Sequence, residues 1–186
     1  MDIKFENSNI VYLVEEVVLS IVDIAKDKNI EIIFNTEEEE IITAIDEEKI
    51  VRVILILLSN SIKFSKEKGD ICVEMRREDE EVVIKVTDNG IGINEDMKEK
   101  IFDKFKRVQS VSNLNVDHEG SGLGLYIAKG FIELHNGSIS VVSEVEKGST
   151  FIITIPIVII KNDLHNIKHM DEDELNRIIK IELSDL

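Results

Sequence analysis

Segments that alternate apolar and polar residues occur in adjacent pairs along this chain, and this pairing constrains its fold more than any other feature. Each pair follows a stretch with helical periodicity, so the element order is helix, strand, strand, three times over. Consecutive strands can pair directly, whereas a doubly wound parallel sheet requires a helix between them. The pattern therefore predicts an α+β fold with a mixed or antiparallel sheet. The expected helices are 8–27, 47–64 and 122–135, and the expected strands are 30–34, 41–45, 70–77, 81–87, 139–145 and 150–155.

Residues at the segment ends support these assignments. Ser8 or Asn9 is placed to cap the first helix, and Asp46 to cap the second, whose first turn is acidic. A short helix is expected over 96–102. Residues 106–119 are polar and lack periodicity, which is typical of a loop.

Net charge limits the ligands that this chain can bind. It has 22 Lys and Arg against 38 Asp and Glu, a net charge of −16. A field of that sign repels a phosphate backbone, so we expect no nucleic-acid partner. A smaller phosphate ligand would have to be bound locally, by backbone amides, a metal ion or one or two placed cations.

Cysteine content and hydropathy indicate a soluble, cytoplasmic domain. The single cysteine, Cys72, cannot form an internal disulfide, and its alternating segment predicts a buried strand residue. The longest apolar run, 151–160, is about half of the roughly 20 residues that a membrane helix needs. The first residues lack the basic and then apolar pattern of a signal peptide.

The segment after Pro156 differs from the rest of the chain. From residue 162 onward it contains seven acidic and three basic residues. Four apolar residues follow an acidic start at helical spacing: Leu175, Ile178, Ile179 and Leu183. We therefore expect a domain over 1–156 and an acidic, helical extension over 157–186, docked on the sheet or on a partner.

Three polar clusters stand at the ends of predicted elements, and the first is Asn60 with Lys63. A spacing of three places both on one helical face. An amide oxygen suits Mg²⁺ and an ammonium suits a phosphate, so the pair could converge on one ligand. The alternative is a helix end with a solvated lysine.

The other two clusters are rich in glycine. In Asp88-Asn-Gly-Ile-Gly-Ile93, the glycines allow a ligand to approach closely, and the carboxylate could accept from an exocyclic amine; the alternative is an ordinary turn. In Gly120-Ser-Gly-Leu-Gly-Leu125, alternate glycines open a helix, where exposed amides favour an anion. The spacing matches neither the Rossmann nor the P-loop motif.

In this order, the clusters resemble the motifs of the catalytic and ATP-binding domain of sensor histidine kinases, within the superfamily that includes gyrase, Hsp90 and MutL. Leu58–Ser65 resembles the N box, Asp88–Gly92 the first glycine box and Ile101–Phe105 the F box. Gly120–Leu125 resembles the second glycine box, and Gly148–Phe151 its closing glycine turn. The resemblance covers residues 5–156 and implies a two-layer α/β sandwich with three helices on one face of a mixed sheet.

The resemblance also implies roles for individual residues. Asp88 would accept from the adenine amino group, Asn60 would hold Mg²⁺ and Lys63 would meet a phosphate, the latter two being the catalytic pair. Thr150 would support the adenine pocket beside Asp88, and 94–119 would form the ATP lid. Phe102 and Phe105 would fasten the base of the lid or belong to the core. The implied ATP and Mg²⁺ site comprises Asn60, Lys63, Phe64, Asp88, Gly90, Gly92, Ile93, Phe105, Gly120, Ser121, Gly122, Leu123, Gly124, Leu125 and Thr150.

Two departures from the family pattern qualify the expected chemistry. Ile56 stands where the family often has Asn and where hydrolysing relatives have Glu, so we expect slow hydrolysis of ATP. None of the four histidines lies in a phosphoacceptor setting, and each is expected to be solvated or capping: His118, His135, His165 and His169.

The resemblance thus implies a protein-histidine kinase domain that donates the γ-phosphoryl group of ATP to a histidine on a separate dimerisation hairpin. A response regulator receiver domain would be the further partner, the isolated domain would be monomeric, and the parent protein could be anchored in the cell membrane. One alternative is a stand-alone serine kinase of the anti-sigma type, against which the F box argues. Another is a degenerate nucleotide-binding scaffold, which Ile56 favours.

Overall fold

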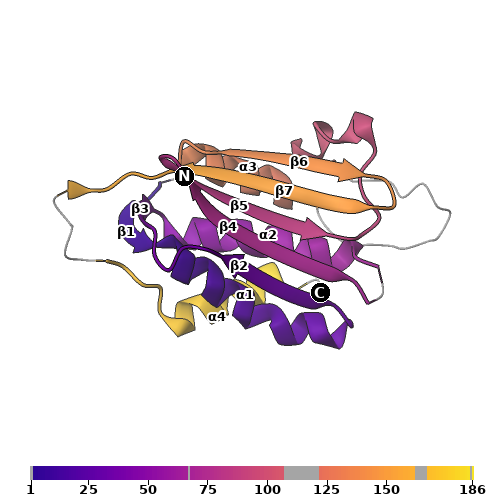
Figure 1. Ribbon diagram of the computed structural model, residues 1–186, viewed down its shortest axis with the longest axis horizontal. Coiled ribbons are helices and arrows are strands. Elements are labelled where there is room, and N and C mark those ends of the chain that lie inside the picture. The colour runs from indigo at the N-terminus through magenta and orange to yellow at the C-terminus, as the bar shows by residue number, and fades with distance from the viewer. Residues whose placement is uncertain (1, 67, 107–121, 162–166, 185) are drawn as a thin grey trace.

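The computed structural model describes residues 2–66, 68–106, 122–161, 167–184 and 186. One layer is a five-stranded sheet and the other is made of helices (Figure 1). The strands lie in the order β2-β4-β5-β7-β6, and only β2 and β4 are parallel to each other. Their bounds are β2 Glu31–Thr36, β4 Asp70–Glu78, β5 Glu81–Asp88, β6 Ser138–Glu144 and β7 Gly148–Pro156. The expected α+β fold with a mixed sheet is confirmed.

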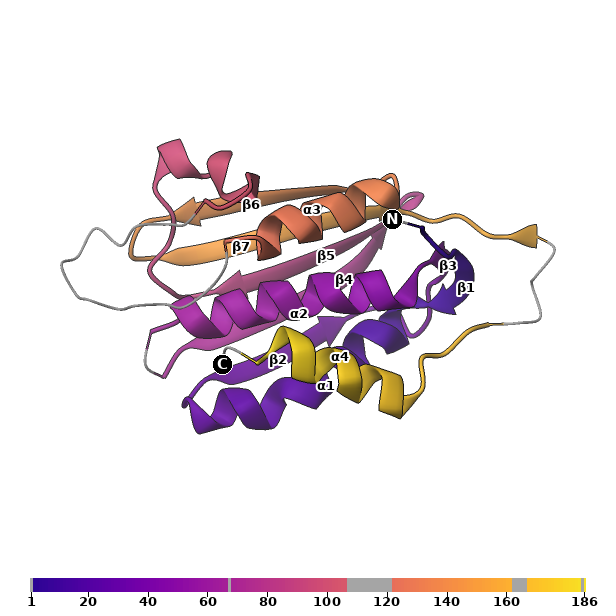
Figure 2. The same cartoon turned by 180° about the vertical axis from the view of Figure 1, so that it is seen from behind.

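Within the described part of the chain, three helices cover one face of the sheet: α1 (Ile10–Asp27), α2 (Glu47–Phe64) and α3 (Gly124–Leu134). Figure 2 shows α4 (Glu172–Glu182) across the outer side of this helical layer, where it contacts α2. Most residues of α2 are buried as a result. Among the described residues, no helix is long and apolar enough to cross a membrane.

The strand pairing differs from the expected one in the first third of the chain. β1 (Glu6–Asn9) and β3 (Ile42–Ile45) form a separate antiparallel sheet, and β2 instead lies beside β4. The expected pairing of consecutive strands is therefore wrong for β2 and β3. β1 was not predicted because its sequence, Glu-Asn-Ser-Asn, has no apolar alternation.

Three local expectations are corrected. The helix expected over 96–102 is two separate 3₁₀ turns, η1 (Glu95–Met97) and η2 (Lys100–Phe102), because too few apolar residues bury themselves there to support a continuous helix. α3 begins two residues later than expected, since Gly122 has a positive φ of 68°. Cys72 is only half-buried, because its strand neighbours point to the helices and it points to the opposite face.

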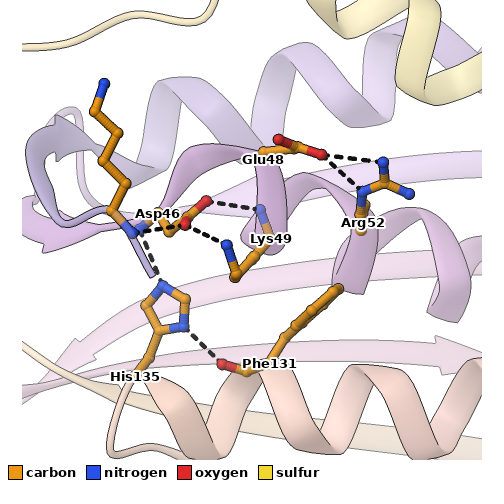
Figure 3. A network of polar contacts seen from close by, with 7 residues as sticks. Asp46, Glu48, Lys49, Arg52, Phe131 and His135 are labelled. Atoms are coloured by element: carbon orange, nitrogen blue, oxygen red, sulfur yellow. Dashed lines mark hydrogen bonds and ion pairs between the residues drawn. The ribbon is translucent and has the colours of Figure 1, made fainter. Parts of the chain in front are cut away.

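The predicted caps of α1 and α2 are confirmed, and the second belongs to a polar network that reaches α3 (Figure 3). Asp46 accepts from the amide and ammonium of Lys49, at 3.2 and 2.5 Å, and from the amide of Lys4 at 2.9 Å. His135 Nε2 accepts from the Asp46 amide at 3.0 Å, while Nδ1 donates to the Phe131 carbonyl at 2.7 Å. His135 is the C-cap of α3, which confirms the capping alternative, and because it is buried it also joins the end of α3 to the start of α2.

Candidate functional site

Asp88, at the end of β5, is the most strongly oriented side chain of the candidate site. It is 6% exposed, and Oδ1 accepts from the amides of Gly90 at 2.9 Å and Ser149 at 3.3 Å. Oδ2 accepts from the Ser61 hydroxyl at 3.4 Å. Burial raises the pKa of Asp88, and these three hydrogen bonds offset that effect only in part. The protein therefore holds a buried carboxylate in one orientation without a cation beside it among the described residues.

The loop after Asp88 is held by backbone contacts that leave no space for a side chain at its two glycines. A Cβ at Gly90 would lie 2.3 Å from the Phe64 carbonyl oxygen, and one at Gly92 would lie 2.0 Å from that of Glu144. Gly92 also has a φ of +70°. The Ile91 amide donates to the Phe64 carbonyl at 3.1 Å. The two glycines are thus required by the packing of this loop between α2 and β6.

The C-terminal end of α2 faces this loop. Ser61 contacts Asp88, and Phe64 binds the loop through its carbonyl. Asn60 and Lys63 lie on the same stretch of continuous helix, and both are partly exposed. The structure therefore places the predicted N-box residues beside the predicted first glycine box.

The start of α3 completes the described part of the site. Gly122 accepts from the Phe105 amide at 3.1 Å, and a Cβ at Gly124 would lie 3.2 Å from Ile56 Cγ2. Leu123 precedes the helix, and its apolar side chain cannot cap the first amides. These amides are suited to an anion. Gly120, Ser121 and lid residues 107–119 lie outside the described residues.

Thr150 does not lie where the resemblance placed it. Its hydroxyl is 3.1 Å from that of Thr87, on the sheet face opposite the helices, because Phe151 next to it belongs to the core. Ser149 lies beside Asp88 instead. Register identifies this neighbour, since Asp88 pairs with Ser149 and Thr87 with Thr150.

Two further serines, which are not among the residues predicted from the sequence, contribute to the site. Ser61 holds Asp88, and Ser143 accepts from the Ile93 amide and donates to the Gly148 carbonyl, both at 2.8 Å. Ser61 directly follows Asn60 and could have been suspected. Ser143 lies on β6 and gives no signal without the strand register.

The two F-box phenylalanines differ. Phe102 is buried and lies edge-on to Phe151, with ring centroids 6.5 Å apart. Phe105 is 71% exposed, so the alternative of a core position is wrong for it, and its backbone amide donates to Gly122 at the start of α3. Its φ of +60° turns the side chain out of the fold.

An open groove of about 470 Å³ runs along α3 beside the F box. Its wall includes Phe102, Tyr126, Ile127, Gly130 and Leu134. Tyr126, Ile127 and Leu134 are each about 40% exposed, which is a high value for neighbouring large apolar residues. The groove begins one turn beyond the glycines that open α3.

The chain is similar to known proteins of one family. Residues 45–159 match the family described as histidine kinase-, DNA gyrase B- and HSP90-like ATPase. Histidine kinase P4 of Formosa agariphila is 34% identical over 83% of this chain, and sensor histidine kinase WalK of Bacillus subtilis is 35% identical over 72%. The chain spans only 12% and 22% of the length of these two relatives.

Solved structures agree with the sequence matches. The catalytic domain of histidine kinase ThkA superposes with a TM-score of 0.73 at 29% identity, covering 84% of this chain and 99% of that one. ThkA has also been solved in complex with the response regulator TrrA, with a TM-score of 0.69 at 27% identity over 84% of this chain and 42% of that one. Full-length ShkA, solved in complex with AMPPNP, gives 0.74 at 25% identity over 86% of this chain and 32% of that one. The chain therefore belongs to the histidine kinase-, DNA gyrase B- and HSP90-like ATPase family, as the catalytic, ATP-binding domain of a sensor histidine kinase.

Proposed function

We propose that this domain binds ATP with Mg²⁺ and donates the γ-phosphoryl group to a histidine on a separate helical hairpin. The observation that carries the proposal is Asp88, a buried carboxylate fixed by three donors and bordered by a loop that admits no side chain at Gly90 or Gly92. Oδ1 is occupied by two backbone amides, whereas Oδ2 receives only the long bond from Ser61. Oδ2 is therefore the atom that accepts the adenine amino group.

The phosphate end of the site would lie between α2 and α3. Asn60 offers an amide oxygen to Mg²⁺, Lys63 offers an ammonium, and the backbone amides at the start of α3, from Gly124 on, donate to phosphate oxygens. When bound, Mg²⁺ neutralises phosphate charge. Because the chain carries a net charge of −16, these few local groups have to supply the attraction for a polyphosphate.

The described residues bind and position ATP, and the nucleophile is the histidine of the partner hairpin. Ile56 lies one helical turn before Asn60, is 7% exposed and faces Gly124. An apolar side chain at this point cannot accept a proton from water. We therefore expect hydrolysis to be slow compared with transfer to the histidine.

The groove along α3 is the surface on which we place the hairpin. It adjoins the phosphate end of the site, and its exposed apolar residues suit the apolar face of a helix. Gly130 supports this placement: a Cβ there would have nothing within 4 Å, so this domain has no steric need for glycine in the middle of α3. A closely packed partner helix would explain it. A receiver domain of a response regulator would then take the phosphoryl group from the histidine, as suggested by the ThkA–TrrA complex.

Calorimetric titration with ATP, with and without Mg²⁺, tests the nucleotide site. Asp88→Asn should abolish binding, and Asn60→Ala should remove mainly the Mg²⁺ dependence. Asn176→Ala on the exposed side of α4 is the matched control and should bind as the unmodified chain does.

Phosphoryl transfer needs a second assay, in which the chain and the hairpin of its parent protein are incubated with γ-labelled ATP. Label on the hairpin histidine supports the proposal. Label on a serine of a partner protein would favour the serine kinase, and tight nucleotide binding without any transfer would favour a scaffold.

A further inference from the structure

The chain after β7 returns along both edges of the small β1–β3 sheet. On the β3 edge, the Ala44 amide donates to the Val158 carbonyl at 2.6 Å, and the Val158 amide donates to the Thr43 hydroxyl at 3.0 Å. On the β1 edge, the Lys168 amide donates to the Asn7 carbonyl at 2.8 Å, and Lys168 bridges in parallel to Ser8. The two-stranded sheet is therefore enclosed by residues from the far end of the chain.

The side chain of Asn7 binds this returning segment as a backbone would. Its Nδ2 donates to the Ile160 carbonyl at 3.0 Å, and its Oδ1 accepts from the Ile160 amide at 2.9 Å. Asn7 is 1% exposed, so both bonds are shielded from water. An ion pair between Lys168 and Glu6, at 3.4 Å, adds a further link.

α4 then fixes the end of the segment to the helical layer. Its buried side chains are Leu175, Ile178, Ile179 and Leu183. Arg52 of α2 bonds Glu182 at 2.6 Å and Glu48 at 3.0 Å. α2 thus has an apolar surface on its outer side that α4 covers, and an arginine that fixes the end of α4.

We propose that residues 157–161 and 167–184 form an intramolecular clasp, which makes β1, β3 and the start of α2 one cooperative unit with α4. β3 leads directly into Asp46, the cap of α2, and Lys4 just before β1 donates to the same carboxylate. Release of α4 would therefore loosen the first strand and the start of α2 together. The match to the family model ends at residue 159, so most of this clasp lies outside the matched residues.

Native-state hydrogen exchange tests the clasp without reference to nucleotide. Ile178→Ala on α4 should raise exchange in residues 6–9 and 42–45 as well as in α4, and should lower Tm by about 4–20 °C. The matched control is Ile181→Ala, the same change on the same helix at a side chain that is 55% exposed. It should leave exchange unchanged and Tm within about 2 °C.

Two outcomes would overturn the clasp: faster exchange confined to α4, or equal effects of the two variants. If Ile178→Ala does not fold, Ile178→Val removes one methyl group and should change the same amides to a smaller extent. Asp88→Asn, which tests the nucleotide site, should leave exchange in 6–9 and 42–45 unchanged. Failure of the clasp and failure of the proposed function therefore give different results.

Discussion

A buried aspartate lies beside each end of α2, and folding shifts the pKa values of the two in opposite directions. Burial alone would raise the pKa of Asp46, but its bonds from Lys49 and Lys4 outweigh burial and hold that pKa below its ordinary value. Asp88 has burial as its largest influence and no cation among its described partners, so its pKa is raised. A carboxylate that is paired with a cation of the same chain stabilises the fold. A carboxylate that is oriented but has no cation beside it is available to bind a ligand.

The largest effect is expected from Asp88→Asn. Asparagine can keep the bonds from Gly90 and Ser149 on its Oδ1, but its Nδ2 cannot accept the adenine amino group. ATP affinity should fall about 100-fold or more, as measured by calorimetry. Unchanged affinity would remove Asp88 from the adenine site.

The same variant should also gain stability. Because the pKa of Asp88 is raised by folding, its contribution is fully present below the unfolded value of 3.8 and is lost as pH rises through the folded pKa. At pH 7 the ionised group therefore costs free energy that asparagine does not. We expect Tm to rise at pH 7, by about 2–4 °C for each kcal/mol recovered. A lower Tm would contradict the assignment of Asp88 as a ligand group that the fold alone does not need.

Asp46→Asn should do the reverse. It replaces Oδ2, which accepts from the Lys49 ammonium and the Lys4 amide, with an NH2 group that cannot accept from either. The free energy of unfolding should fall by about 1–3 kcal/mol, measured by thermal or urea unfolding, while ATP affinity is kept. Lower ATP affinity in a folded Asp46→Asn variant would show that the two ends of α2 are not independent of each other.

A smaller effect concerns pH and His135. Burial lowers the pKa of His135, so its contribution to stability is present above the unfolded value of 6.5 and is lost as pH falls toward the folded pKa. Tm should therefore decline between pH 7 and 5. Gln can accept from the Asp46 amide without titrating, so the decline should be shallower in His135→Gln; equal slopes would assign it to other groups.

The smallest effect on stability is expected midway along α3, at Gly130. Gly130→Ala should stabilise the domain by about 1 kcal/mol, since alanine favours helix and the added methyl group meets nothing. ATP affinity should be unchanged, whereas phosphoryl transfer to the hairpin should slow because the methyl group occupies the groove. Transfer at the original rate would place the hairpin elsewhere.

Short-range patterns predicted one part of the site and could not predict the rest. Asp88, Gly90 and Gly92 are close in sequence, as are Asn60 and Lys63, so one loop and one helix end could be identified from spacing. Ser149 was missed in favour of Thr150 because a register shift of one residue reverses the sheet face, and the register depends on contacts with β5.

The fold shows the same limit. Helix caps and apolar periodicity are local, so Asn9 and Asp46 were identified correctly. β1 has a polar sequence and is a strand only because β3 and the returning chain supply its partners. His135 stands at a helix end, which predicts a solvated or capping role; it is the C-cap of α3, and only the distant Asp46 amide explains its burial.

The pairing of Asn7 with Ile160 joins residues 153 positions apart, which has a consequence for how the protein is made. During synthesis, the first strand leaves the ribosome long before the segment that encloses it. The five-stranded sheet is complete once β7 has been made, whereas the edges of the small sheet are covered only by the chain beyond β7. A chain truncated after β7 would therefore contain all five strands of the large sheet while its first strand still has an open edge.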